Sequence, residues 1–164
     1  RFKCDWSSDV CSSDLHQSLQ LSLHSNHGYT RVDGNRGEDE SSLEITGYNL
    51  SREFSVPDAN LLVAKAWADP ISGNEWVVAV WRSPEAGTVV TFSYIDDNGV
   101  HQHQQKLNYA YVGDETDDHY LLLLQRDSDC VVGVGHSLGR DNRHFAFYRL
   151  TEQGVPNREG GSWD

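Results

Sequence analysis

A hydrophobic pattern that occurs twice in the second half of the chain constrains the fold more than any other feature. Trp76–Val100 reads WVVAVWRSPEAGTVVTFSYIDDNGV, and Cys130–Val155 reads CVVGVGHSLGRDNRHFAFYRLTEQGV. In each copy a valine-rich run leads through a polar loop to a second apolar run, which ends at a turn closed by Gly-Val. The central Phe92 and Phe147 are 55 positions apart, whereas the valine-rich runs are 54 apart. Such a period indicates one supersecondary unit that buries its apolar face by stacking on copies of itself.

Short runs rich in Val, Trp, Phe and Tyr are separated by Gly, Pro, Asn and Asp, which predicts antiparallel strands. The expected strands are Leu61–Trp67, Trp76–Arg82, Thr88–Ile95 and Lys106–Val112, then Tyr120–Gln125, Cys130–His136 and His144–Leu150. A helix over Asp117–Arg126 is the alternative at one of them, and its short length and the turn that follows favour a strand. Four strands in a unit of this length are typical of a β-propeller blade.

The first third of the chain has a less regular pattern. Leu19–Leu23 and Leu43–Tyr48 alternate between apolar and polar residues and predict short strands. His24–Ser42 is polar and acidic and predicts a long loop, while Leu50–Asn60 contains a proline and is expected to be irregular.

We therefore expect an all-β chain built from antiparallel four-stranded blades of a truncated, β-propeller-like repeat protein. Residues 16–60 would form a degenerate or truncated blade with a long acidic loop, 61–112 a blade, and 113–164 a blade truncated at its C-terminus. Closed propellers have four or more blades. A fragment with fewer exposes sheet edges and apolar faces, so we expect the isolated chain to self-associate.

The second copy of the pattern resembles the delta-sixty-type repeat of bacterial secreted β-propeller proteins. Within Cys130–Asn157, the segments VVGVG, HSLGRDN, HFAFYRL and TEQGV match the valine-rich strand, Gly-rich loop, aromatic strand and Asx-Gly turn of that repeat. Trp76–Val100 matches more loosely, and Ser128-Asp129 replaces the Asp-Gly of the family pattern. The resemblance implies a propeller and an extracellular or periplasmic location, and it supplies no catalytic residues.

The N-terminal segment Asp5–Leu15, DWSSDVCSSDL, resembles the translated read of a sequencing-library adapter. We therefore expect residues 1–15 to be a disordered artefact that replaces the natural N-terminus. Cys4 and Cys11 lie beside or within it. The remaining Cys130 supports neither a disulfide framework nor a zinc site.

The formal net charge of −12 argues against two classes of partner. Nucleic acids and anionic membrane surfaces are bound by basic patches. No apolar run approaches the length of a membrane span. The partners that we expect are a protein or a carbohydrate.

Gly135-His136-Ser137-Leu138-Gly139 fits G-x-S-x-G, the nucleophile elbow of α/β-hydrolases. An elbow requires a helix after the serine and a histidine well downstream. Here a bulky polar segment follows, and the only later histidine is His144. A truncated serine esterase with Ser137 as nucleophile is therefore the alternative to a non-catalytic module. A helix over Arg140–Leu150 would favour the esterase, and a strand would favour the blade.

Asp33, Asn35, Asp39 and Glu44 occupy positions 1, 3, 7 and 12 of a stretch that could supply oxygen ligands to calcium. Position 6, where calcium loops need glycine, is Glu38. We interpret the stretch as a solvated acidic loop, with a calcium site as the alternative, and we expect no other cofactor.

Histidines and aromatic residues complete the candidates. His101 and His103 share one face of an extended chain, and His24 and His27 could share a turn, but two ligands make a poor metal site. The strand aromatics are expected to pack between sheets, with any outward-facing ones available to stack on a sugar or a partner chain: Trp67, Trp76, Trp81, Tyr94, Tyr109 and Tyr111. The function that we expect is a non-catalytic binding or structural module.

Overall fold

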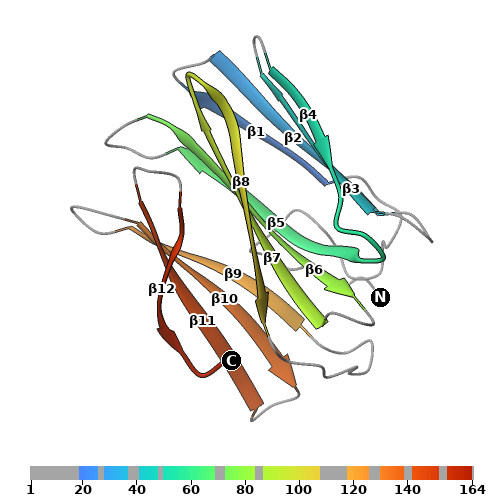
Figure 1. Ribbon diagram of the computed structural model, residues 1–164, viewed down its shortest axis with the longest axis vertical. Helices are drawn as coiled ribbons and strands as arrows, with labels where there is room; N and C mark the ends of the chain where they lie inside the picture. The colour runs from blue at the N-terminus through green and yellow to red at the C-terminus, as the bar shows by residue number, and fades with distance from the viewer. Residues whose placement is uncertain are drawn as a thin grey trace.

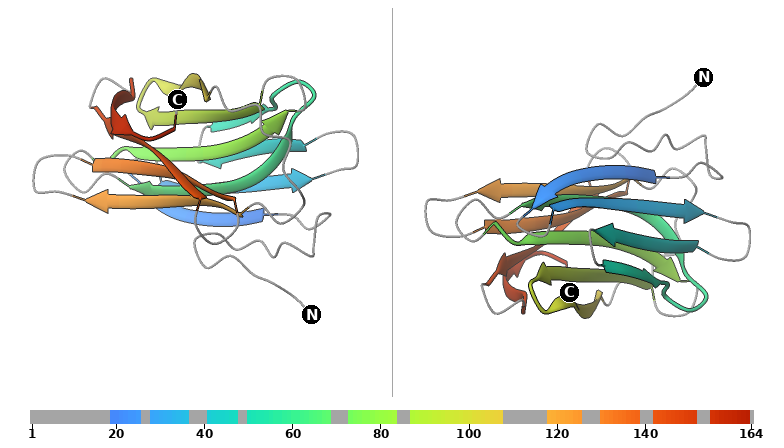
Figure 2. Two further views of the ribbon diagram at one scale, coloured as in Figure 1. Left: turned by 90° about the horizontal axis from the view of Figure 1, so that it is seen from below. Right: turned by 90° about the horizontal axis from the view of Figure 1, so that it is seen from above.

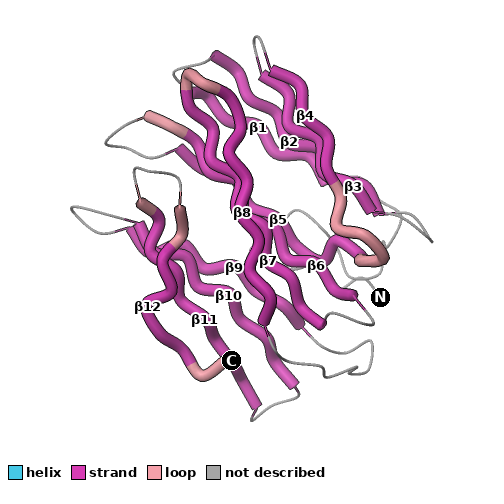
Figure 3. The backbone as a smooth tube through the Cα atoms, viewed as in Figure 1, coloured by secondary structure: helices cyan, strands magenta, loops and turns pink. Residues whose placement is uncertain are grey.

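The computed structural model describes ten segments of the chain, and all of its regular structure is strand (Figures 1 and 3). The described residues are 19–25, 28–36, 41–47, 50–68, 73–83, 87–107, 118–125, 130–138, 142–151 and 155–163. The adapter-like segment lies outside them.

The strands form three antiparallel four-stranded sheets, each ordered as in the sequence. The first sheet contains β1 (Leu19–Ser25), β2 (Gly28–Arg36), β3 (Ser41–Gly47) and β4 (Leu50–Phe54). The second contains β5 (Asn60–Ala68), β6 (Glu75–Ser83), β7 (Gly87–Asp96) and β8 (Gly99–Leu107). The third contains β9 (Asp118–Gln125), β10 (Cys130–Leu138), β11 (Asn142–Leu150) and β12 (Asn157–Gly161). The predicted all-β class with antiparallel four-stranded sheets is confirmed.

Several strands lie where the sequence predicted loops. The expected acidic loop His24–Ser42 contains β2, and the segment expected to be irregular begins with β4. The fourth strand of the second sheet, β8, starts directly after the turn at Gly99 and not at Lys106. The third sheet also has a fourth strand, β12. The strands β8 and β12 are polar sheet edges, and most of their residues are exposed.

The second sheet lies between the other two (Figure 1). Nearly all residues of β6 and β7 are buried, on both faces of the sheet. Continuous apolar runs rather than alternating ones are the expected sequence of strands covered on both sides. The valine-rich pattern of these two strands is therefore explained by sheets packed above and below them.

Separate hydrophobic clusters hold the sheets together. Between the second and third sheets, the Phe92 ring packs edge-on against the Tyr148 ring, with centroids 4.9 Å apart. Between the first and second sheets, Leu43 and Ile45 pack in one cluster with the fully buried Trp81. The Trp81 indole Nε1 donates a hydrogen bond of 2.9 Å to Thr91 Oγ1, which satisfies a buried polar group.

The sheets approach each other most closely near their first strands. The backbone of β5 contacts β1, β2 and β3 on one side and β9 on the other. Figure 2 shows β1 and β9 at one side of the molecule and the fourth strands β8 and β12 at the opposite side. None of the three sheets closes on itself, since each ends in two edge strands.

The register of the strands gives the structural equivalence of the two sequence copies. Val78 lies opposite Phe92 in the second sheet, and Gly133 lies opposite Phe147 in the third. Val78 and Gly133 are 55 positions apart, as are Phe92 and Phe147. The valine-rich runs match best in sequence at a spacing of 54, so their sequence alignment is shifted by one residue from the structural alignment. A shift of one residue moves every side chain of a strand to the other face. Gly133 thus occupies the position of Val78, on the face turned away from the molecule's centre.

Glycines in β10 allow two phenylalanine rings to lie close to the backbone of the neighbouring strand. A Cβ atom on Gly135 would lie 2.5 Å from the Phe145 ring, and one on Gly133 would lie 3.0 Å from the Phe147 ring. The two rings are stacked on each other, with centroids 6.0 Å apart. The outer face of the third sheet therefore presents flat aromatic rings over a glycine-lined strand.

Arg158 fastens the edge strand β12 to the rest of the third sheet. Its guanidinium lies 5.5 Å from the centre of the Tyr148 ring and donates to the Trp163 carbonyl oxygen. Its Nε also donates to the Gly160 carbonyl oxygen at 2.8 Å. Burial raises the pKa of the Tyr148 hydroxyl, an effect that the hydrogen bond and the charge of Arg158 partly offset.

We predict that Phe92→Ala lowers the free energy of unfolding by about 3–5 kcal/mol, because the ring is fully buried between two sheets. Phe147→Ala is the matched control, because it removes the same ring at the equivalent position on an outer face. Its cost should be less than half as large, since Phe147 is only partly buried. Urea unfolding at low protein concentration measures both, and equal losses would contradict the stacking order.

The buried Tyr148 predicts a loss of stability in alkali. Its folded-state pKa lies above the unfolded value of about 10, so its stabilisation is complete below that pH and is lost as pH rises through the folded pKa. Tyr148→Phe should flatten the fall of unfolding free energy above about pH 10. Arg158→Gln should extend this fall to higher pH and deepen it, because without Arg158 the folded-state pKa of Tyr148 lies further above the unfolded value. Identical pH profiles for all three proteins would contradict the assignment.

Candidate functional site

The strands β2, β6 and β10 run in the same direction through the three sheets (Figure 1). The turn between β7 and β8 therefore lies at one end of the strands, and Ser137, near the end of β10, lies at the opposite end of the strands. We call the first the turn end. The predicted turn Asp97-Asn98-Gly99 is confirmed there, and Gly99 has a φ of 121°, which favours glycine.

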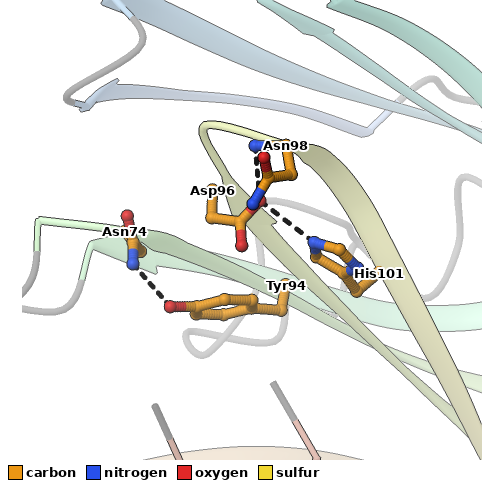
Figure 4. Close-up of polar contacts among 5 residues, drawn as sticks. All are labelled: Asn74, Tyr94, Asp96, Asn98 and His101. Carbon is orange, nitrogen blue, oxygen red and sulfur yellow. Dashed lines mark hydrogen bonds and ion pairs between the residues drawn. The ribbon is translucent and has the colours of Figure 1, made fainter. Parts of the chain in front are cut away.

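A hydrogen-bonded cluster lies at the turn end (Figure 4). The Asp96 carboxylate accepts from the backbone N–H of Asn98 at 2.8 Å, which fixes the turn. The same oxygen lies 3.0 Å from His101 Nε2, on the next strand. The side chains of His101 and Asp96 are 44% and 23% exposed, so both can reach a ligand in solvent.

Aromatic residues support this cluster from below. Tyr94 is buried, and its ring packs at 4.9 Å on Trp76 and at 6.2 Å from His101. The Tyr94 hydroxyl accepts a hydrogen bond from the Asn74 amide, which lies before β6 (Figure 4). We call Asn74, Tyr94, Asp96, Asn98 and His101 the turn cluster. It combines a carboxylate, an imidazole and an amide on a rigid aromatic base, an arrangement suited to hydrogen-bonding a polar ligand.

The segment around Ser137 does not form a nucleophile elbow. Ser137 is a buried residue of β10, opposite Arg143 in β11, and the structure has a strand over Asn142–Leu150 where an elbow needs a helix. Neighbouring residues of a strand point to opposite faces. His144 lies opposite His136, so both histidines lie on the sheet face opposite to Ser137. The sequence motif is present, but its serine and histidine cannot approach each other.

The candidate calcium residues lie in paired strands and not in the expected loop. Asp33 and Asn35 belong to β2, Glu44 belongs to β3 opposite Asp33, and Asp39 is outside the described residues. Arg31 Nε donates to the Asp33 carboxylate at 3.1 Å, and the Thr46 hydroxyl donates to the Glu44 carboxylate at 3.2 Å. Within the described part of the chain, no three His, Cys, Asp or Glu side chains are grouped to hold a metal ion.

The histidines fall into sets that the sequence only partly predicted. His101 and His103 do share one face of β8, opposite Tyr94 and Phe92. His24 lies in β1, and His27 is not described. The register also places His119 and His144 on either side of His136, across β9, β10 and β11. The His136 ring packs on Trp163 at 5.3 Å. Sequence spacing could not reveal this row because it depends on strand pairing.

The aromatic residues that the structure places are mostly core. Trp76, Trp81 and Tyr94 are buried, as the expectation of packing between sheets requires. Trp67 lies in β5, while Tyr109 and Tyr111 are outside the described residues.

Comparisons with protein-family models, with curated proteins and with solved structures find no match to this chain. No site residues can therefore be carried over from a relative. In the segments that the structure describes, no helix is long and apolar enough to cross a membrane.

Proposed function

We propose that the chain is a non-catalytic module of the β-propeller type, in which each four-stranded sheet is a blade. The observation that carries the proposal is the face-to-face stacking of three such sheets in sequence order, with both faces of the middle one buried. The convergence of the sheets on β5 supports a radial arrangement, because blades approach each other most closely at their innermost strands. The resemblance of Cys130–Asn157 to a propeller repeat agrees with this assignment.

The binding surface of the module is the turn end. Propellers and other all-β scaffolds carry binding residues on loops held by rigid sheets. The turn cluster meets this description, since Asp96, Asn98 and His101 project from a tight turn that the buried Tyr94 and Trp76 support. A protein or carbohydrate partner with polar groups fits the donors and acceptors of the turn cluster. The stacked sheets give the module a structural role in addition to binding. The acidic balance of the chain disfavours nucleic acid as the partner.

Binding can be tested by exposing the labelled full-length chain to arrays of oligosaccharides and of peptides. For the array compounds that bind the wild type, we expect His101→Ala or Asp96→Asn to weaken binding at least about tenfold, which is a loss of about 1.4 kcal/mol in binding free energy. Asp96→Asn keeps the oxygen that accepts from the Asn98 N–H, so the turn is preserved. Arg143→Ala is the matched control, because it changes an exposed residue at the end of the strands opposite to the turn end. Binding that depends on Arg143 and not on the turn cluster would contradict the assignment, as would no binding on either array.

The non-catalytic assignment is tested with Ser137→Ala. Because Ser137 and His144 lie on opposite faces of the sheet, we expect wild type and variant to hydrolyse p-nitrophenyl acetate at the same background rate. His144→Ala serves as the second variant. An esterase activity that disappears with the Ser137 hydroxyl would overturn the proposal in favour of a serine hydrolase.

A further inference from the structure

The outer face of the third sheet carries two of the three exposed large apolar side chains in the described part of the chain, with the exposed Arg143 and Arg149 beside its apolar residues. Leu122 and Leu124 of β9 are 47% and 49% exposed, and only Val155 is comparable among the large apolar side chains described. The partly buried Phe145 and Phe147 of β11 lie on the same face, opposite Gly135 and Gly133. We call Leu122, Leu124, Phe145 and Phe147 the β9–β11 face.

The structure itself indicates what kind of element covers such a face. Fifty-five positions earlier, the pairs Val78–Phe92 and Val80–Val90 correspond to Gly133–Phe147 and Gly135–Phe145. In the second sheet those residues are fully buried, and they share one cluster with Val132, Ala146 and Tyr148 of the third sheet. The β9–β11 face thus continues, one sheet further on, an interface that the chain already makes. Its natural partner is the apolar face of another sheet.

Among the side chains that the structure describes, the outer side of the first sheet does not offer such a face. The outer side of the first sheet carries Arg31, Asp33, Glu44, Thr46 and Glu53, in positions that alternate with the buried Val32, Leu43 and Ile45. A head-to-tail contact between two chains would place apolar rings on this charged surface and would desolvate its carboxylates. Among the described side chains, apolar surface meets apolar surface when two copies of the β9–β11 face come together, which is an isologous contact about a two-fold axis.

We propose that the β9–β11 face is a homodimer interface, in which the third sheets of two copies of this chain pack face to face. The inference goes beyond the proposed function and does not depend on what the turn end binds.

The size and charge of the face set the strength of this dimer. A sheet of four strands, each up to nine residues long, covers about 19 Å by 30 Å, so each partner buries about 500–600 Å². The total of about 1,000–1,200 Å² is at the lower end of specific interfaces, and the dimer should dissociate in the micromolar range. Each chain carries a net charge of −12, and salt screens the repulsion between the two copies. Dimerisation should therefore strengthen as salt rises.

Sedimentation velocity of the full chain, in reducing buffer from about 1 to about 100 μM, tests the proposal. The wild type should pass from monomer to dimer over this range, with a lower dissociation constant at higher salt. Leu122→Lys combined with Leu124→Lys should leave a monomer throughout, a shift of at least about tenfold in the dissociation constant. Val155→Lys is the control for a single such change, because it places one lysine on an equally exposed apolar residue outside the sheet, and it should dimerise as the wild type does.

Three outcomes would overturn the proposal. One is a wild type that stays monomeric over the whole range, and another is a Leu122/Leu124 variant that dimerises normally while its melting temperature matches that of the wild type. The third is growth beyond dimers that Glu53→Lys abolishes, which would show a head-to-tail contact through the first sheet.

Discussion

The burial of both faces of the second sheet is the constraint on which the rest of the structure depends. The strands β6 and β7 are buried along almost their whole length, and a single covering layer would leave half of their side chains in water. Burying one large apolar side chain contributes about 1.5–3 kcal/mol. The two flanking sheets supply this burial, since the first sheet covers Trp81 and the third sheet covers Phe92. The order of the sheets in space follows from this requirement.

Much of the architecture could be predicted from the sequence, because strands covered on both faces leave a strong apolar signal. The strands that were missed, such as β2 and β8, are polar and belong to outer sheets or to sheet edges. Their conformation is imposed by pairing with a neighbour rather than by their own composition. The one-residue difference between the two valine-rich runs has the same origin. Sequence identity aligned Val78 with Val132, whereas strand pairing aligns it with Gly133, and only the second alignment places each residue on its true face.

The candidate sites show how strand pairing decides which residues of a sequence motif lie together. The residues around Ser137 match a catalytic pattern in spacing, but the pattern needs a strand followed by a helix, and here a hairpin follows. Asp33 and Glu44 match the spacing of a calcium loop, yet strand pairing places them side by side across β2 and β3. The turn cluster was only partly visible in the sequence. The turn at Asn98 was predicted, but the contacts of Asp96 with His101 and of Asn74 with Tyr94 join residues from different strands and loops.

The polar fourth strands have a consequence for how this protein behaves when concentrated. β8 presents Gln, His and Lys side chains along a free sheet edge, and β12 is short, charged and paired through a register shift beside Phe147. Edges of this kind resist the addition of a foreign strand, which is the first step toward amyloid-like fibres. The edge strands β8 and β12 are thus protected against strand-by-strand polymerisation, even though the neighbouring β9–β11 face is apolar.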